Sequence, residues 1–317
     1  MATVGQILAS THRAFLDEVA DNVLTGIPLL ESLMQQNRVT YKGGRQIVEP
    51  ILKALPSGGA YTGLDQFAAT DNDELDAAVY EWMSYRAMPA ISGMDSFKNS
   101  GDAEVISIWG TKMQAAGMKI REDLAAALFA DAITWDSSLN ITPLEAILDD
   151  NDTFTVGGLK ATDVALWTGQ TTVAGAAGAL STLMLETGCL NASEGYQRPT
   201  DIILSKAGYG KFWSLAQLLQ RFRGSDKTVG FENFIFDTSK VYWDSHILTT
   251  GGSFTAQRAY ILNANWLRVN IGEGANFVME DKTPTNADGY VAQIKLYCQL
   301  STNARRFQAT VDNFTTT

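Results

Sequence analysis

The chain has 317 residues, of which 45% are hydrophobic, and its formal net charge is -11. This length allows one large or two modest domains with a substantial core, and the composition excludes disordered and fibrous classes. Proteins that bind a nucleic acid backbone use clustered Lys and Arg, so the acidic balance argues against wrapping DNA or RNA. The same balance is compatible with a passive wall around nucleic acid.

No run of residues approaches the roughly 18 to 20 apolar residues that cross a bilayer. Residues 1–17 lack a basic stretch followed by an apolar one, so we expect no secretion signal and a protein kept in a cytoplasm. Cys189 and Cys298 are far apart in the sequence, which favours two buried free thiols over a disulfide.

The chain begins with helical patterns. Apolar side chains over residues 4–25 fall near one stripe, which predicts a helix. Pro28 interrupts this pattern, and a second short helix is expected to continue to Met34. The glycine pair Gly43-Gly44 then marks a turn.

Two extended segments follow, and residues 56–76 between them are rich in turn formers. Residues 45–55 contain Pro50, which fits an edge strand, and residues 77–91 are rich in aromatic side chains. We therefore predict a long hairpin with an elaborate tip. A two-stranded hairpin of this length is marginal in water and offers open edges, so it either lies on a neighbouring molecule or folds back on its own domain.

Residues 102–133 give the strongest helix signal. Acidic Asp102 and Glu104 occupy the first turn, where the helix dipole favours negative charge. The apolar residues recur at steps of three and four: Val105, Trp109, Met113, Ala116, Ile120, Leu124 and Ala127. A helix of this length needs a sheet or other helices along it.

The remaining pattern mixes helices and strands. Residues 136–175 are expected to form loops with short strands, and helices are predicted over 176–187 and from Ser205. Short or half-buried strands are predicted over 201–204, within 231–243, and over 259–262, 267–271 and 290–300. The interleaving of long helices with antiparallel strands predicts the α+β class.

The sequence predicts no active site. With His12 and His246 as the only histidines and two scattered cysteines, no zinc spacing exists, and no Gly-x-Ser-x-Gly motif is present. The acidic residues 149–152 lack the later Gly and Glu of a calcium loop, and residues 224–228 and 272–277 fail the phosphate-loop and dinucleotide patterns. We expect no catalytic, cofactor-binding or metal-binding residues, and therefore not an enzyme.

Four local stretches, in this order, carry a resemblance to a known family. They are residues 37–44 with 47–51, residues 60–65, residues 97–101, and the basic pair Arg305-Arg306. With the order of elements, they resemble the major capsid proteins of tailed bacteriophages, which have the Hong Kong 97-type shell fold. The similarity covers nearly the whole chain.

The resemblance implies a division of the chain into five parts. These are an N-terminal arm over 1–37, an extended β-hairpin loop over 38–98, a peripheral domain with its spine helix over 99–159, a mainly axial domain over 160–255, and C-terminal strands over 256–317 that return to the peripheral domain. The subunit-interface residues that we expect on this basis are Tyr61, Leu64, Phe67, Tyr80, Trp82, Arg305 and Arg306.

The resemblance also implies self-assembly. Copies of the chain would form hexamers and pentamers of an icosahedral head, which encloses double-stranded DNA without sequence-specific binding. The expected partners are the chain itself, a separate scaffolding protein, a portal and decoration proteins, with no membrane. The chain would occupy the host cytoplasm before assembly and the virion after it. Two alternatives stay open: an encapsulin-like compartment shell, and a soluble α+β enzyme or binding protein.

Overall fold

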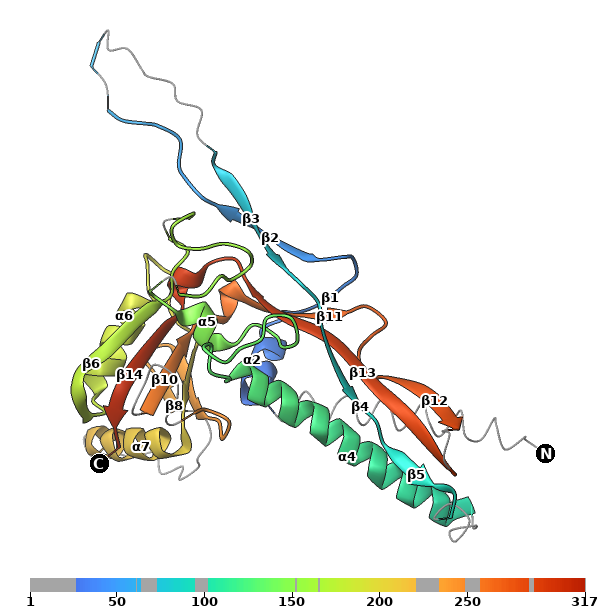
Figure 1. Ribbon diagram of the computed structural model, residues 1–317. Helices are drawn as coiled ribbons and strands as arrows, with labels where there is room; N and C mark the ends of the chain where they lie inside the picture. The colour runs from blue at the N-terminus through green and yellow to red at the C-terminus, as the bar shows by residue number, and fades with distance from the viewer. Residues whose placement is uncertain are drawn as a thin grey trace.

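The computed structural model describes residues 27–60, 62–63, 73–94, 102–151, 153–164, 166–220, 234–248, 257–284 and 288–316. The helix expected over 4–25 lies outside these residues, as does His12. Figure 1 shows an elongated sheet with a long helix along it, a second body that contains the C-terminal strand, and a hairpin that reaches away from both.

The elongated sheet has six strands built around one long strand, β13 (Gly289–Thr302). Its other strands come from both ends of the sequence: β1 (Val39–Lys42), β4 (Met83–Ala87), β5 (Ala90–Ser92), β11 (Leu267–Gly272) and β12 (Val278–Pro284). Four of them pair antiparallel with β13, and β1 extends the sheet by pairing parallel with β11. The predicted half-buried strand is confirmed, because Ile294, Leu296 and Cys298 on one face are at most 2% exposed.

The long helix α4 spans Asp102–Leu128 and lies along this sheet (Figure 1). Its 27 residues make a rod about 40 Å long at a rise of 1.5 Å per residue. Where side chains are described, the predicted apolar stripe is confirmed, since Met113, Ile120 and Leu124 are at most 3% exposed. The stripe packs the helix on the sheet, where α4 contacts β4 and β13.

The sequence pattern predicts that the helix continues to residue 133, but α4 ends at Leu128. The last turn tightens as the N–H of Ala130 donates to the carbonyl of Ala127 at 3.4 Å. The N–H of Ala132 then donates to the buried Glu145 carboxylate at 2.8 Å. This side-chain acceptor replaces the helical carbonyl and turns the chain away from the helix axis.

The second body contains a mixed six-stranded sheet in the order β6-β14-β10-β7-β9-β8. The strands are β6 (Gln170–Ala179), β7 (Asp201–Leu204), β8 (Phe234–Phe236), β9 (Ser239–Trp243), β10 (Gln257–Leu262) and β14 (Ala309–Thr315). Helices α6 (Thr182–Asn191) and α7 (Lys206–Gln220) contact these strands and share a core with them. Tyr260, Ile203 and Leu262 belong instead to the core that this body shares with α4 and the elongated sheet.

One predicted helix is partly wrong. Residues 176–179, expected within a helix over 176–187, belong to strand β6, and the helix α6 begins only at Thr182. Many residues of Gln170–Ala179 are small. They pair parallel with β14, whose backbone supplies their hydrogen-bond partners, and so they form a strand. Ser181 separates the two elements, because its hydroxyl accepts the Met184 N–H at 3.2 Å and caps the helix.

The C-terminal strands divide between the two sheets. β11, β12 and β13 belong to the elongated sheet, while β10 and β14 belong to the second body. The chain crosses between the sheets at η1 (Ala264–Trp266) and again at η2 (Arg305–Phe307). Residues 256–317 therefore contribute strands to both sheets and connect the two parts.

A short N-terminal helix also connects these parts. α2 (Pro28–Gln35) begins at the proline that the sequence pattern singles out, and it packs against β11. The Ser32 hydroxyl donates to the buried carboxylate of Asp201 in β7 at 2.5 Å, and the Gln36 side chain donates to the same group at 3.2 Å. These bonds fix α2 between the two sheets and so fix the point from which β1 and the hairpin start.

Candidate assembly interface

The part of the chain that leaves the body is the hairpin of β2 (Ile47–Leu52) and β3 (Leu75–Tyr80), shown at the top of Figure 1. These two strands form a sheet of their own, with no third strand among the described residues. Their register pairs six apolar residues across the strands: Val48 with Val79, Pro50 with Ala77, and Leu52 with Leu75. Since paired residues share a face, these six residues form one side of the hairpin, which we call the apolar strip.

The opposite side of β2 is held by a buried carboxylate. Glu49 is 2% exposed, and its oxygens lie 3.2 Å from Lys42 Nζ and 3.2 Å from Arg268 Nη1. The Ser301 hydroxyl donates to the same carboxylate at 3.3 Å. A buried charge persists only when it is paired, so this cluster binds the root of the hairpin to β1, β11 and β13.

β3 is fixed by contacts to two other segments. The Tyr80 hydroxyl donates to the Thr302 carbonyl at 2.9 Å, and burial raises the pKa of this phenol well above its ordinary value. The Val79 N–H donates to the carbonyl of Gly157 at 2.9 Å. Gly157 has a φ of +61°, and a Cβ there would lie 2.6 Å from the Ala78 Cβ, so only glycine permits this approach.

The apolar strip itself faces away from the body. Val48 is 54% exposed, Leu52 61% and Leu75 71%, whereas Ile47 and Ala78 on the other side are at most 1% exposed. Beyond the strip, Lys53 and Asp76 form an ion pair at 3.9 Å across the hairpin. The hairpin is therefore buried and bonded to the body on its inner side at the root, and apolar and uncovered on its outer side.

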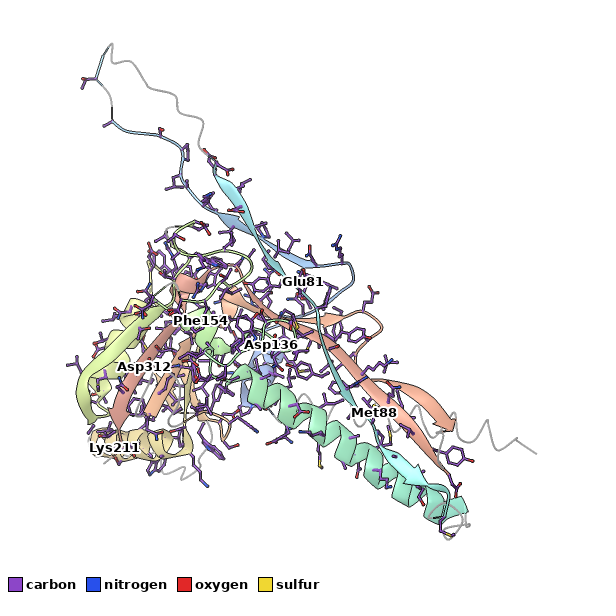
Figure 2. The ribbon with its side chains drawn as sticks, viewed as in Figure 1. Glu81, Met88, Asp136, Phe154, Lys211 and Asp312 are labelled. Carbon is purple, nitrogen blue, oxygen red and sulfur yellow. The ribbon has the colours of Figure 1, made fainter. Side chains whose placement is uncertain are left out.

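The structure gives different surroundings to the residues predicted at the subunit interface. Tyr61, Leu64 and Phe67 lie outside the described residues. Trp82 is half-buried next to the hairpin root, where its Nε1 donates to the Gly44 carbonyl at 3.0 Å. Figure 2 labels Glu81 at this same place, where the chain passes from the hairpin into the elongated sheet.

Two of the predicted interface residues are buried inside the subunit. Tyr80 is 3% exposed and Arg305 is 0% exposed. The Arg305 guanidinium donates to four backbone carbonyls at 2.8 to 2.9 Å, those of Ala146, Ile147, Asp149 and Trp167. Such burial leaves the Arg305 side chain no surface to offer a neighbour, and its bonds instead connect η2 to the end of α5 (Leu144–Leu148).

Arg306 lies beside it but remains partly exposed. Its guanidinium pairs with Glu194, and it stacks over the Phe307 ring at 4.8 Å from the centroid. The apolar strip was not among the predicted interface residues. A signal for it exists in residues 47–52, where apolar residues stand on both faces of a strand that Pro50 marks as an edge.

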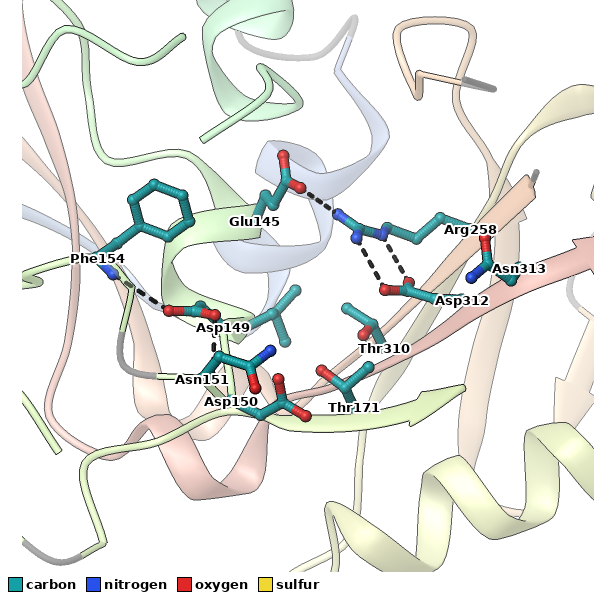
Figure 3. Close-up of a pocket in the computed structure, with 11 residues that line it drawn as sticks. Glu145, Asp149, Asp150, Asn151, Phe154, Thr171, Arg258, Thr310, Asp312 and Asn313 are labelled. Atoms are coloured by element: carbon teal, nitrogen blue, oxygen red, sulfur yellow. Dashed lines mark hydrogen bonds and ion pairs between the residues drawn. The ribbon is translucent and has the colours of Figure 1, made fainter. Parts of the chain in front are cut away.

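A cavity of about 300 Å³ opens beside α5 and β14 (Figure 3). Its arginine is bound by two of its carboxylates: Arg258 makes two bonds to Asp312, at 2.6 and 2.8 Å, and an ion pair with Glu145 at 2.9 Å. The Asp149 carboxylate accepts backbone N–H groups of the following turn, which agrees with a turn and not with a cation loop. No His, Cys, Asp and Glu cluster suited to a metal occurs in the described part of the chain.

The other residues that the sequence analysis considered for chemistry are the two cysteines and His246. Cys189 and Cys298 are free and buried, as predicted, and burial raises the pKa of each thiol to about 12. His246 lies between Asp244, at 2.8 Å, and Glu122 of α4, at 3.3 Å. Among the described helices, none has the length and apolar character that crossing a bilayer requires.

No protein-family model and no curated protein matches this chain. Solved structures do match it. The capsid asymmetric unit of cyanophage A-1(L) superposes with a TM-score of 0.64 at 12% identity, covering 88% of this chain and 91% of that one. The capsid of a native GTA particle gives 0.60 at 13% identity, with 90% of each chain covered.

The holo-SrpI encapsulin complex of Synechococcus elongatus PCC 7942 is also similar, with a TM-score of 0.56 at 11% identity over 90% of this chain and 88% of that one. These similarities cover most of this chain and most of each matched chain. They confirm the predicted α+β class. The chain has the fold of phage capsid proteins.

Proposed function

We propose that this chain is the major capsid protein of a tailed bacteriophage. Copies of it assemble as hexamers and pentamers into an icosahedral head around double-stranded DNA. The observation that carries this proposal is a hairpin that leaves the body with an uncovered apolar side, in a subunit with a capsid-protein fold. The proposal gives the chain a structural role and no catalytic one.

The parts of the subunit have separate roles in this proposal. The N-terminal arm of residues 1–37 reaches along adjacent subunits with the part that precedes α2, since α2 packs in its own subunit. In the extended loop of residues 38–98, the β2–β3 hairpin lies over a neighbour in the same capsomer, while β1, β4 and β5 belong to the subunit's own elongated sheet. Residues 99–159 contribute the spine helix and the peripheral domain, and residues 160–255 form most of the axial domain. The sheet topology supports a divided assignment of 256–317, with β11, β12 and β13 in the peripheral domain and β10 and β14 in the axial one.

The partners follow from the shell. A separate scaffolding protein, a portal and decoration proteins are the additional components, and the subunit passes from the host cytoplasm into the virion. The net charge of -11 supports an inner wall that encloses DNA without binding particular sequences, because a strongly acidic surface repels the phosphate backbone.

An encapsulin-like compartment is the second candidate, supported by the similarity to the SrpI complex. The two candidates share the shell and differ in its contents. Nuclease-protected DNA in particles made during infection supports the capsid, whereas an enclosed enzyme supports the compartment.

Electron microscopy of the purified protein tests the proposal. We expect closed shells, or capsomers that close into shells at higher protein concentration. A stable, monodisperse monomer at all concentrations up to the solubility limit would contradict it.

A further inference from the structure

We propose that the apolar strip docks face-on against an apolar surface of a second copy of this chain, and that the hairpin does not join the neighbour's sheet by adding a strand. This inference rests on the proposed function, and it deepens it by naming the contact surface and the mode of contact. The strip consists of Val48, Pro50, Leu52, Leu75, Ala77 and Val79.

The outer edge of β2 is a poor template for another strand. The Lys53 N–H donates to the Glu74 carbonyl at 2.8 Å, so this pair and every second pair along the hairpin are the hydrogen-bonded ones. The backbone groups of the alternate residues therefore point outward, away from the partner strand. Pro50 stands in the middle of these outward positions and has no N–H to donate.

The outer edge of β3 is occupied by the chain itself. Of its outward N–H groups, that of Val79 donates to the Gly157 carbonyl at 2.9 Å. That of Ala77 donates to the Asp76 carboxylate at 2.8 Å. Two of the three outward donors of β3 are thus already bonded, those of Ala77 and Val79, which makes this edge a poor template for strand addition and favours a face of the hairpin as the contact.

Only one of the two faces is available. The inner face carries Glu49 and Tyr80, both at most 3% exposed and bonded to the body. The outer face contains no ionisable side chain along the strip, and three of its residues are more than half exposed, namely Val48, Leu52 and Leu75. A partner for this face must present an apolar surface of its own.

The charged residues near the strip indicate which class of partner it can contact. The cations near the strip are each paired with a carboxylate: Lys53 with Asp76, and Lys42 and Arg268 with Glu49. This surrounding is unfavourable for an anionic membrane and for nucleic acid, both of which attract clustered Lys and Arg. Two copies of a chain with a net charge of -11 repel each other, and a strip free of carboxylates lets them touch where that repulsion is least.

The size of the strip points to a repeated contact. Strands of six residues, at about 3.3 Å per residue, give a ribbon about 20 Å long and roughly 10 Å wide, so its face is about 200 Å². A stable one-to-one complex buries about 800 Å² per partner. The strip alone is too small for such a complex, but it suffices as one contact among many in a closed assembly of identical subunits.

The test compares two double variants with the wild type. Leu52→Asp with Leu75→Asp places charge in the strip, and Leu52→Met with Leu75→Met keeps the strip apolar as the matched control. Assembly is followed by sedimentation velocity and electron microscopy over a concentration series. We expect the wild type and the Met variant to assemble alike, and the Asp variant to need at least about tenfold more protein, since each subunit buries two carboxylates.

Thermal unfolding of unassembled subunits separates assembly from folding. Because Leu52 and Leu75 are exposed in the subunit, the Asp variant should unfold within a few degrees of the wild type. If it fails to fold, Leu52→Ser with Leu75→Ser takes its place and should shift assembly in the same direction. Pro50→Val restores an outward N–H while keeping the strip apolar, and we expect it to leave assembly within about twofold of the wild type.

The outcomes separate the inference from the proposed function. If the wild type assembles and the folded Asp variant assembles at the same concentration, the face-on contact is wrong and the shell proposal stands. A tenfold gain in assembly with Pro50→Val would show strand addition and also overturn the inference. A wild type that stays monomeric would overturn the shell proposal, and the inference with it. Binding of the wild type to lipid vesicles, lost in the Asp variant and without assembly, would assign the strip to a membrane and overturn the inference.

Discussion

The two sides of the β2–β3 hairpin contrast within one pair of strands. The inner side is buried in the core through Ile47, Ala78 and Tyr80. Glu49 lies on the same side, where Lys42 and Arg268 pair with its carboxylate. The outer side is apolar and uncovered along the strip. Large apolar side chains left uncovered are the exception in a soluble monomer, and the outer side of this hairpin carries three of them, Val48, Leu52 and Leu75. The inner side therefore fixes the direction of the hairpin within the subunit. The outer side is left for a contact that the subunit cannot make alone.

The largest effect is expected at a buried polar anchor near the hairpin root. Arg305→Ala leaves four buried carbonyls without their charged donor, so we expect the free energy of unfolding of the subunit to fall by about 4 kcal/mol. Urea titration of unassembled subunits measures it. Arg306→Ala is the neighbouring control, and its partly exposed ion pair should contribute less than about 1 kcal/mol. Equal losses of stability for the two variants would contradict the claim that Arg305 is a buried anchor and Arg306 is not.

Glu49→Ala should have the next effect, because it leaves Arg268 and Lys42 beside a buried site without their carboxylate. Both cations are more than a third exposed, so we expect a loss of about 2 kcal/mol, below that for a fully buried pair. Exposed Glu81, at the same root, is the control, with an expected change within about 0.5 kcal/mol for Glu81→Ala. A Glu49→Ala subunit as stable as the wild type would show that the cluster does not hold the root.

A further effect depends on pH and is absent at neutral pH. Cys298 lies in β13 with its side chain on the buried face of the elongated sheet, where burial raises the pKa of its thiol from an ordinary value of 9.0 to about 12. Stability is therefore complete below pH 9 and is lost as pH rises towards 12, because only the unfolded state releases the proton. The slope from this thiol approaches about 1.4 kcal/mol per pH unit. Cys298→Ala should flatten the alkaline loss in unfolding titrations between pH 9 and 11, and an unchanged slope would contradict the assignment.

The smallest effect on the subunit is expected in the apolar strip. Leu52→Ala and Leu75→Ala remove side chains that are 61% and 71% exposed, so each should change the free energy of unfolding by less than about 0.5 kcal/mol. Leu204→Ala, at 0% exposure, is a control of the same chemistry and should cost about 3 kcal/mol. A large loss at Leu52 would mean that the strip already packs inside the subunit.

The sequence predicted those elements whose periodicity was strong. The stripe of α4, the alternation of β13 and the edge strand marked by Pro50 all appear in the structure. Strand β6 was missed, because its small residues fit either a helix or a strand and its pairing with β14 involves residues more than a hundred positions away. The role of Arg305 was also missed, since a cradle of backbone carbonyls from 146–149 and 167 leaves no motif in the sequence.

The apolar strip illustrates the same limit. Residues 47–52 show apolar side chains on both faces, but only the fold reveals which face the body covers and which it leaves open. Local pattern decides whether a strand forms, and the tertiary contacts of Glu49 and Gly157 decide how the hairpin is turned.

Cryo-electron microscopy of assembled particles tests the central claim most directly. The account predicts that in every capsomer the side of the hairpin with Val48, Leu52 and Leu75 lies against another copy of the chain, while Glu49 keeps its contacts within its own subunit. Particles in which this side faces solvent, or in which the hairpin folds back on its own body, would contradict it.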